Sequence, residues 1–276
     1  MLLLLYIAGI VLWTPCDSYA DSRAFDDSDV DSRYNIRSLD DSDVDSRYSR
    51  SLGNSGADSR SRDHGGISMG PHVDCDDGKT NLEVDWDSRS TAEHTCDPGV
   101  VLTKDTKYKP EMFCEKKPKS PIHVCIKDSI TYHHHLPISG SHRPVWPTYG
   151  TYRYLPPQRW LHGLEHAAIL LVYHPCVDTK DLQPLIDLLR SCVRRHLITP
   201  YKGLSKSKPF ALAAWGCKLE MSIPDVKKAK EFIMARANKG LEPYVYYHGG
   251  YNSGLTQIAT VVSDIKDHTV CPSNKE

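Results

Sequence analysis

The sequence predicts an α+β domain, a small mixed β-sheet with packed helices that is stapled by disulfides and preceded by a disordered acidic arm. Three observations predict this class. Apolar runs of strand length alternate with amphipathic helical stretches within residues 131–276. Eight cysteines follow an apolar leader. Residues 21–70 are mostly Asp, Ser, Arg and Gly, with few large apolar side chains.

The first twenty residues are expected to act as a signal peptide. Leu2 to Trp13 is an apolar run of signal-peptide length that is too short to span a bilayer. Ser18 and Ala20 place small residues where a cut after Ala20 needs them. The expected product is secreted and extracellular, with no membrane anchor, because no later apolar run is long enough to span. An uncleaved anchor is the alternative.

The cysteine count agrees with export. Cleavage after Ala20 removes Cys16 and leaves an even set, which in an exported chain indicates a disulfide framework. No Cys-x-x-Cys pair is present, which argues against a zinc finger or a thioredoxin-like motif. Spacing alone leaves the pairing open. The cysteines expected in disulfides are Cys75, Cys96, Cys114, Cys125, Cys176, Cys192, Cys217 and Cys271.

The acidic arm, residues 21–70, contains a nine-residue repeat. Asp-Asp-Ser-Asp-Val-Asp-Ser-Arg-Tyr occurs at 26–34 and again at 40–48. An EF-hand is excluded, because loop position 6 is Ser32 rather than Gly and position 12 is Ser38 rather than Glu. A flexible polyanion of this kind can bind Ca(II) weakly or contact a mineral surface, as in a skeletal or shell matrix. A solvated linker or a removable pro-segment is the alternative.

Two regions follow the arm. Residues 71–130 hold four cysteines among polar residues and predict a loop-rich region held by disulfides, with a bond to the main domain left open. The formal net charge of −1 gives no reason to expect nucleic acid as a partner. Residues 131–276 carry the core. The elements expected there are helix 158–166, strand 167–173, helix 178–196, strand 210–217, helix 224–238 and strand 244–247.

The first expected helix carries a candidate metal site. His162 and His166 are four residues apart, so on a helix both imidazoles lie on one face, as two ligands of one metal ion require. Glu165 completes the pattern His-x-x-Glu-His. His142, in a turn-forming stretch, is the expected third ligand and His135 a candidate fourth. Imidazoles suit Cu or Zn and suit Ca badly.

Two other interpretations of this helix stay open. The histidines can simply be hydrogen-bonded within the fold, with no metal. Alternatively, the pattern is that of inverted zincins, in which the glutamate acts as general base in a metallohydrolase. That activity needs a further acidic ligand, for which Glu231 and Glu242 are the candidates. No nucleophile motif surrounds Cys176 or Ser139, so an enzyme is the less favoured class.

These motifs also carry a resemblance. Pro137-x-Ser-Gly-x-His142, Tyr149-Gly-x-Tyr152 and Leu161-His-x-Leu-Glu-His166 occur in one order. Over about residues 131–250 the chain resembles a bacterial and animal domain family of unknown function. Residues 171–176 and 212–221 are similar to its animal branch, which includes tumour protein p53-inducible protein 13. The resemblance implies one extracytoplasmic domain and singles out His142, His162, Glu165 and His166, but implies no activity.

Two function classes follow. One is a secreted matrix protein of unknown activity that associates with a mineralised matrix through its acidic arm. The other is an extracellular Cu- or Zn-binding module built on the His-x-x-Glu-His segment. The sequence leaves the oligomeric state open.

Overall fold

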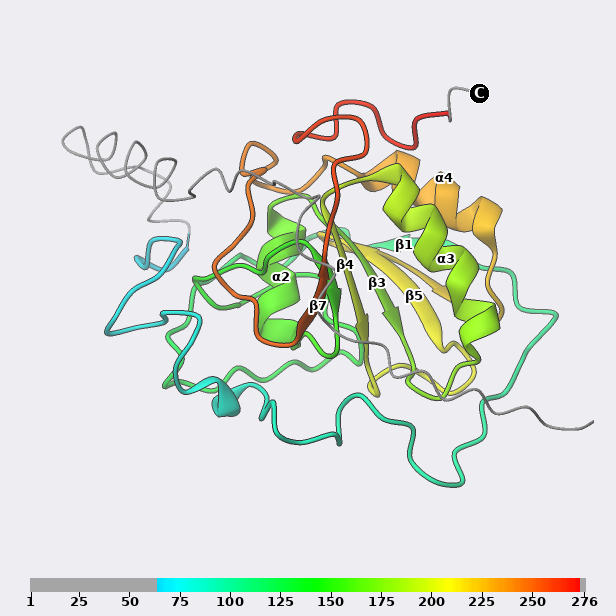
Figure 1. Cartoon of the computed structure of the whole chain (residues 1–276), viewed down its shortest axis with the longest axis horizontal. Helices are drawn as coiled ribbons and strands as arrows, with labels where there is room; N and C mark the ends of the chain where they lie inside the picture. The colour runs from blue at the N-terminus through cyan, green and yellow to red at the C-terminus, as the bar shows by residue number, and fades with distance from the viewer. Residues whose placement is uncertain (1–63, 274–276) are drawn as a thin grey trace, which may run out of the picture. The chain divides into compact units, whose positions relative to one another are not determined.

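The computed structural model describes residues 64–273, which contain a seven-stranded mixed sheet and three α-helices (Figure 1). The expected signal peptide and nearly all of the acidic arm lie outside the described residues. The predicted α+β class, with a mixed sheet, packed helices and disulfides, is confirmed. The strands are β1 (Met112–Cys114), β2 (Gly150–Tyr152), β3 (Ile169–Tyr173), β4 (His196–Pro200), β5 (Phe210–Ala214), β6 (Cys217–Met221) and β7 (Leu255–Ile258). The helices are α2 (Pro157–Glu165), α3 (Thr179–Cys192) and α4 (Val226–Arg236), with a short 3₁₀ turn η2 at Leu82–Val84.

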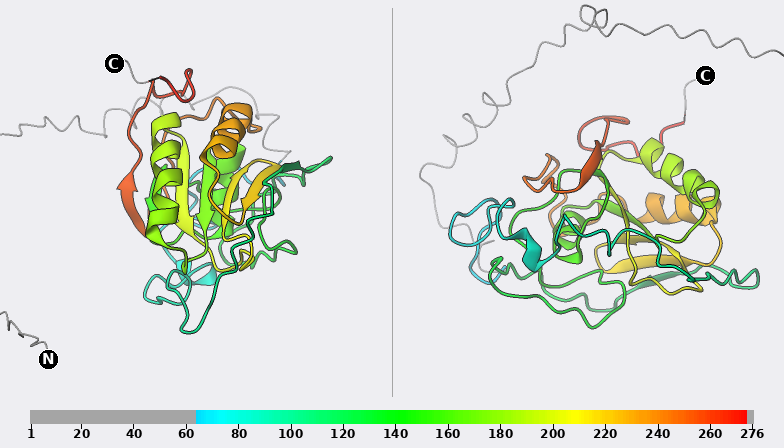
Figure 2. Two further views of the ribbon diagram at one scale, coloured as in Figure 1. Left: turned by 90° about the vertical axis from the view of Figure 1, so that its right-hand side faces the viewer. Right: turned by 60° about the horizontal axis from the view of Figure 1, so that its bottom comes forward.

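The strand order is β1-β6-β5-β3-β4-β2-β7. Strand β4 pairs in parallel with both β3 and β2, and the other pairs are antiparallel. Helix α3 connects the parallel strands β3 and β4, as a crossover requires. Helix α2 covers one face of the sheet, and α3 and α4 lie side by side on the other (Figures 1 and 2).

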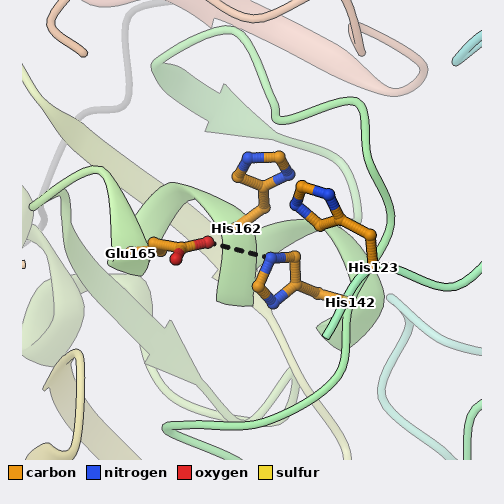
Figure 3. Close-up of side chains that lie close together, drawn as sticks. All are labelled: His123, His142, His162 and Glu165. Carbon is orange, nitrogen blue, oxygen red and sulfur yellow. Dashed lines mark ion pairs between the residues drawn. The ribbon is translucent and has the colours of Figure 1, made fainter. Parts of the chain in front are cut away.

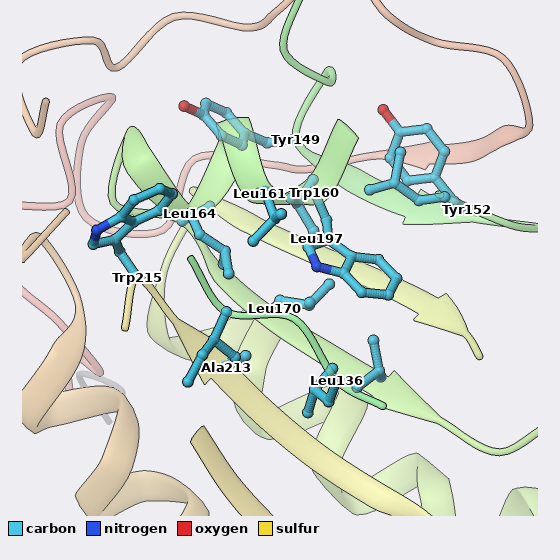
Figure 4. Close-up of a cluster of buried hydrophobic side chains, with 14 of the residues drawn as sticks. Leu136, Tyr149, Tyr152, Trp160, Leu161, Leu164, Leu170, Leu197, Ala213 and Trp215 are labelled. Atoms are coloured by element: carbon cyan, nitrogen blue, oxygen red, sulfur yellow. The ribbon is translucent and has the colours of Figure 1, made fainter. Parts of the chain in front are cut away.

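The central strand β3 is apolar on both faces, which is why it reads as a continuous apolar run. Leu170 and Val172 pack into the cluster beneath α2, which Figure 4 shows with Trp160 and Leu164 of that helix. The alternate residues Ile169 and Leu171 pack against α3 and α4 on the opposite face. Each face of the sheet therefore has its own hydrophobic cluster.

Helix α2 is short and lies close to the sheet. Pro157 occupies its first turn, where a missing N–H costs nothing. Gly163 faces β4, and a Cβ built there would lie 2.7 Å from Cδ1 of Leu197. The chain leaves the helix at His166 and turns through Ala167, whose φ of 68° is in the left-handed region. The start of the segment 162–166 is thus held close to the sheet.

All eight expected cysteines form disulfides, which are Cys75–Cys125, Cys96–Cys176, Cys114–Cys217 and Cys192–Cys271. Two of the four bonds join residues 71–130 to the main domain. In addition, β1 from the cysteine-rich region pairs with β6 at the edge of the sheet. The loops of residues 71–130 are therefore attached to the sheet rather than free of it.

Two expected elements were wrong. The helix predicted to reach His196 ends at Cys192, and Val193 is already extended. The backbone N–H groups of Arg194 and Arg195 donate instead to the buried carboxylate of Asp267, and β4 begins at His196.

Residues 244–247 form no strand. The carbonyl of Tyr246 accepts a hydrogen bond from the guanidinium of Arg194, and that of Tyr247 accepts one from the indole of Trp146. These carbonyls are bonded to side chains, so no strand ladder forms. Within residues 64–273, no helix has the length and apolar character needed to cross a membrane.

Candidate metal centre

Three histidines share one hydrogen-bonding pattern, with Nδ1 against a backbone carbonyl oxygen. Nδ1 of His123 lies 2.7 Å from the carbonyl oxygen of Ile67, Nδ1 of His142 lies 2.8 Å from that of Gly140, and Nδ1 of His162 lies 2.6 Å from that of Arg143. A carbonyl oxygen only accepts, so each Nδ1 carries the proton and donates it. In the neutral ring, Nε2 is then left with a free lone pair.

The backbone brings these histidines together from three segments. His162 projects from α2, whereas His123 and His142 lie on loops that run parallel and pair with each other. The N–H of Val124 donates to the carbonyl of His142, and the N–H of His142 donates to that of Ile122. The disulfide Cys75–Cys125 closes a loop two residues from His123. Pairing and disulfide together fix a loop that has no regular secondary structure.

Glu165 completes the group. It lies three residues after His162 on α2, so both side chains lie on the same face of the helix. Its Oε2 is 3.0 Å from Nε2 of His142, the contact dashed in Figure 3. One ligand atom from each of His123, His142, His162 and Glu165 lies within 4.8 Å of all the others. We call these four residues the inner group.

The inner group is buried and lacks regular hydrogen bonds at its centre. His142, His162 and Glu165 are at most 1% exposed. All three Nε2 atoms, and Oε2 of Glu165, have no hydrogen-bond partner of regular geometry. Each buried polar atom without a partner costs about 1–3 kcal/mol. Four such atoms facing one another are expensive unless a cation lies between them.

Burial also sets the protonation states. It lowers the pKa of His123 to about 3, helped by the neighbouring His142. It lowers the pKa of His162 well below its ordinary value, with His166 and His142 adding to the effect. Burial raises the pKa of Glu165, but the adjacent imidazoles of His142 and His64 outweigh it and lower the pKa to about 2. At neutral pH, His123 and His162 are therefore neutral and Glu165 is a carboxylate, the protonation states that metal ligands need.

A single proton does not account for this arrangement. A proton on Nε2 of His142 would pair that ring with Glu165, 3.0 Å away. The Nε2 atoms of His123 and His162 would still face the same centre without a donor. A metal ion bound at about 2.0–2.2 Å from each ligand atom would satisfy all four at once.

Three further residues surround the inner group. The ring of His64 stacks on His123, and its Nε2 lies 2.9 Å from Oε1 of Glu165. The ring of His166 lies beside Trp146, with Nδ1 3.6 Å from Oε2 of Glu242. The N–H of Glu242 donates to the carbonyl of Glu165, at the end of α2. A Cβ on Gly240 would lie 2.2 Å from that same carbonyl, so only glycine lets this loop approach the helix.

The structure brings together only some of the residues singled out in the sequence. His142, His162 and Glu165 lie in the inner group, and His166 lies next to it. His135 lies apart, with Nε2 2.7 Å from Oε1 of Glu220 on β6. Glu231 is on α4, where it pairs with Lys228.

His123 and His64 were not found by sequence reasoning. Both lie on loops outside any periodic pattern. The only signal for His123 is its position two residues before Cys125, a residue expected to be fixed in a disulfide.

A family of proteins of unknown function, DUF3105, matches residues 123–248. The expected resemblance to a family of unknown function is thus confirmed, over a slightly different range. The matched segment contains all four residues of the inner group and leaves out His64. None of the curated proteins matches the chain, and none of the solved structures does.

Proposed function

We propose that residues 64–273 form an extracellular metal-binding module that holds Zn(II) or Cu(II) with His123, His142, His162 and Glu165. The observation that carries the proposal is the convergence of three buried Nε2 atoms and one carboxylate oxygen, all lacking regular hydrogen bonds, while each Nδ1 is fixed by a backbone carbonyl. Such Nδ1 partners orient histidine ligands in metal sites. Three imidazoles and one carboxylate suit Zn(II) and Cu(II).

The site favours retention of an ion over hydrolysis. Catalytic zinc sites use three protein ligands and leave a position for water, whereas this group offers four, all buried. Glu165 is one of the four, and both of its oxygens lie within 3.0 Å of a histidine nitrogen. It is therefore placed as a ligand and not as a free general base. The ion would cross-link the His123 loop, the His142 loop and α2.

Metal analysis of the secreted protein tests the proposal. After dialysis against trace Zn(II) or Cu(II), the wild-type chain should retain at least one tightly bound ion. The double variant His142→Ala, His162→Ala should lose it, and Glu165→Gln should weaken it. The matched control is His135→Ala, which removes an imidazole that is half exposed and paired with Glu220. A wild-type protein that folds and retains no ion overturns the proposal.

Export is part of the same proposal. Four disulfides among the described residues indicate an oxidising environment, and the apolar leader of residues 2–13 agrees with secretion. Mass spectrometry of the N-terminus should find a product beginning at Asp21. Kinship with the animal branch that includes p53-inducible protein 13 is likewise proposed, on residues 171–176 and 212–221. A structure from that branch without a buried histidine group would contradict it.

The acidic arm supports a second candidate function, association with Ca(II), mineral or matrix. The observation behind it is the exact repeat of residues 26–34 at 40–48, which sets four carboxylates in each copy. Deleting residues 21–63 should abolish binding to a calcium mineral while leaving metal retention by the folded domain unchanged. Equal mineral binding by the shortened chain would remove this candidate.

A further inference from the structure

Beyond the inner group, a second set of ligand atoms shares Glu165. One atom from each of His64, Glu165 and Glu242 lies within 4.8 Å of the other two. The two carboxylate oxygens of Glu165 point to different partners, Oε1 to His64 at 2.9 Å and Oε2 to His142 at 3.0 Å. A carboxylate so placed can bridge two ions, one on each oxygen.

His166 provides an independent indication that an ion binds near Glu242. Its ring is fully buried, yet neither ring nitrogen forms a hydrogen bond of regular geometry. Its Nδ1 faces the Glu242 carboxylate at 3.6 Å, longer than a hydrogen bond. An imidazole nitrogen and a carboxylate oxygen, the two atoms of this contact, are both of the kinds that bind transition-metal ions. The remaining oxygen of Glu242 is held by the hydroxyl of Tyr244 at 3.0 Å, which orients the carboxylate.

We infer that the domain has a second metal position, formed by His64, Glu165 and Glu242 with His166 beside them, and that Glu165 bridges it to the inner position. This inference rests on the proposed function. The expected ligand is a second divalent transition ion, Zn(II) or Cu(II), because the donors are again imidazole and carboxylate.

Charge sets the order in which the positions fill. A first ion in the inner position neutralises the shared carboxylate of Glu165. The second ion binds against the positive charge of the first, so it binds more weakly. His64 and Glu242 are slightly more exposed than the inner ligands, at 7% and 5%. The second position is therefore the outer one and fills last.

Calorimetric titration of the metal-free secreted protein with Zn(II) tests the inference. The wild-type chain should bind two ions in two steps. Glu242→Gln, which keeps the shape of the side chain, should weaken the second step at least about tenfold and leave the first nearly unchanged. His64→Ala, at the start of the described residues, serves as a second variant should Glu242→Gln fail to fold. The control variant replaces His133, His134 and His135 by Ala and should still bind two ions.

The outcomes separate the two proposals. One ion in both the wild-type chain and Glu242→Gln overturns the second position and leaves the inner one standing. Two ions in Glu242→Gln but one in the control variant also overturns it, because the weaker ion then sits on the His133–His135 run. No bound ion in the wild-type chain overturns both. A Cu(II)-loaded sample adds a spectroscopic check, because two ions bridged by Glu165 should give an electron paramagnetic resonance signal below two spins per chain.

Discussion

The two faces of the sheet are covered by different kinds of side chain. Helices α3 and α4 cover one face with apolar side chains such as Leu189 and Phe232. The α2 face has an apolar cluster as well, but beside it lie buried histidines, Glu165, and the ion pairs Arg143–Asp85 and Arg159–Asp76. Loops from residues 64–149 and the disulfide Cys75–Cys125 hold these polar groups in place. The α3 and α4 face is an apolar core, whereas the α2 face also buries charged side chains.

The largest expected difference between the faces is metal-linked stability. An ion present at about a thousand times its Kd stabilises the folded chain by about 4 kcal/mol. Chelation should therefore lower the free energy of unfolding of the wild-type protein by about that amount, and His162→Ala should show no such loss. Denaturant unfolding with and without chelator measures both. Equal sensitivity of the variant to chelator would contradict the account.

A change on the α3 face should be large but independent of metal. Leu189 is fully buried between α3 and the sheet. Leu189→Ala should cost about 3 kcal/mol through lost burial and the cavity that remains. The same unfolding experiment should give that cost with and without chelator. A cost that changes with chelator would show that the two faces are coupled.

His196 allows the pH dependence of stability on the α3 and α4 face of the sheet to be measured separately. It begins β4 on the side of Ile198, and its Nδ1 donates to the carbonyl of Val193 at 2.7 Å. Burial lowers its pKa to about 4. The unfolded chain then binds a proton more readily than the folded one, so stability is lost as the pH falls below about 6.5 and the loss is complete near 4.

Between pH 7.5 and pH 5 this histidine should account for about 2 kcal/mol of the lost stability. His196→Asn keeps an N–H donor but does not titrate, so its stability should fall correspondingly less over this range. Unfolding by denaturant at the two pH values measures the difference, with chelator present so that metal release does not contribute. An identical fall in the wild-type chain and the variant would refute the assignment.

The smallest expected effect concerns the carbonyl that orients His142. Gly140 has a φ of +121°, which other residues rarely adopt, and its carbonyl accepts from Nδ1 of His142. Gly140→Ala should shift this carbonyl and weaken metal binding about tenfold, close to 1.4 kcal/mol. Gly99→Ala is the matched control, since Gly99 also has a positive φ and has open space around it. Equal affinities in the two variants would show that the carbonyl does not matter.

The helices and strands could be predicted from the sequence where their apolar residues follow a regular pattern. The continuous apolar run of β3 and the amphipathic stripe of α3 are visible in the sequence because each element buries a regular set of side chains. The end of α3 was not predictable, since it depends on Asp267, more than seventy residues away. Strand β4 was missed for the same reason, because the chain after Cys192 is directed by a distant partner.

The residues of the candidate site likewise divide into those that the sequence predicts and those that it does not. His162 and Glu165 lie close together because they are neighbours on one helix, so local spacing predicts them. His166 shares that spacing, yet the chain leaves α2 there and turns its ring toward Glu242. His123 and His64 reach the site through loop pairing, which no local pattern encodes.

A crystal structure of the secreted protein, with anomalous diffraction collected at the Zn or Cu absorption edge, tests the central claim most directly. The account predicts an anomalous peak among Nε2 of His123, His142 and His162 and a carboxylate oxygen of Glu165, at about 2.0–2.2 Å from each. The account would be contradicted by a metal-loaded protein whose anomalous peak lies elsewhere. In that structure, these three nitrogens would contact only ordered water.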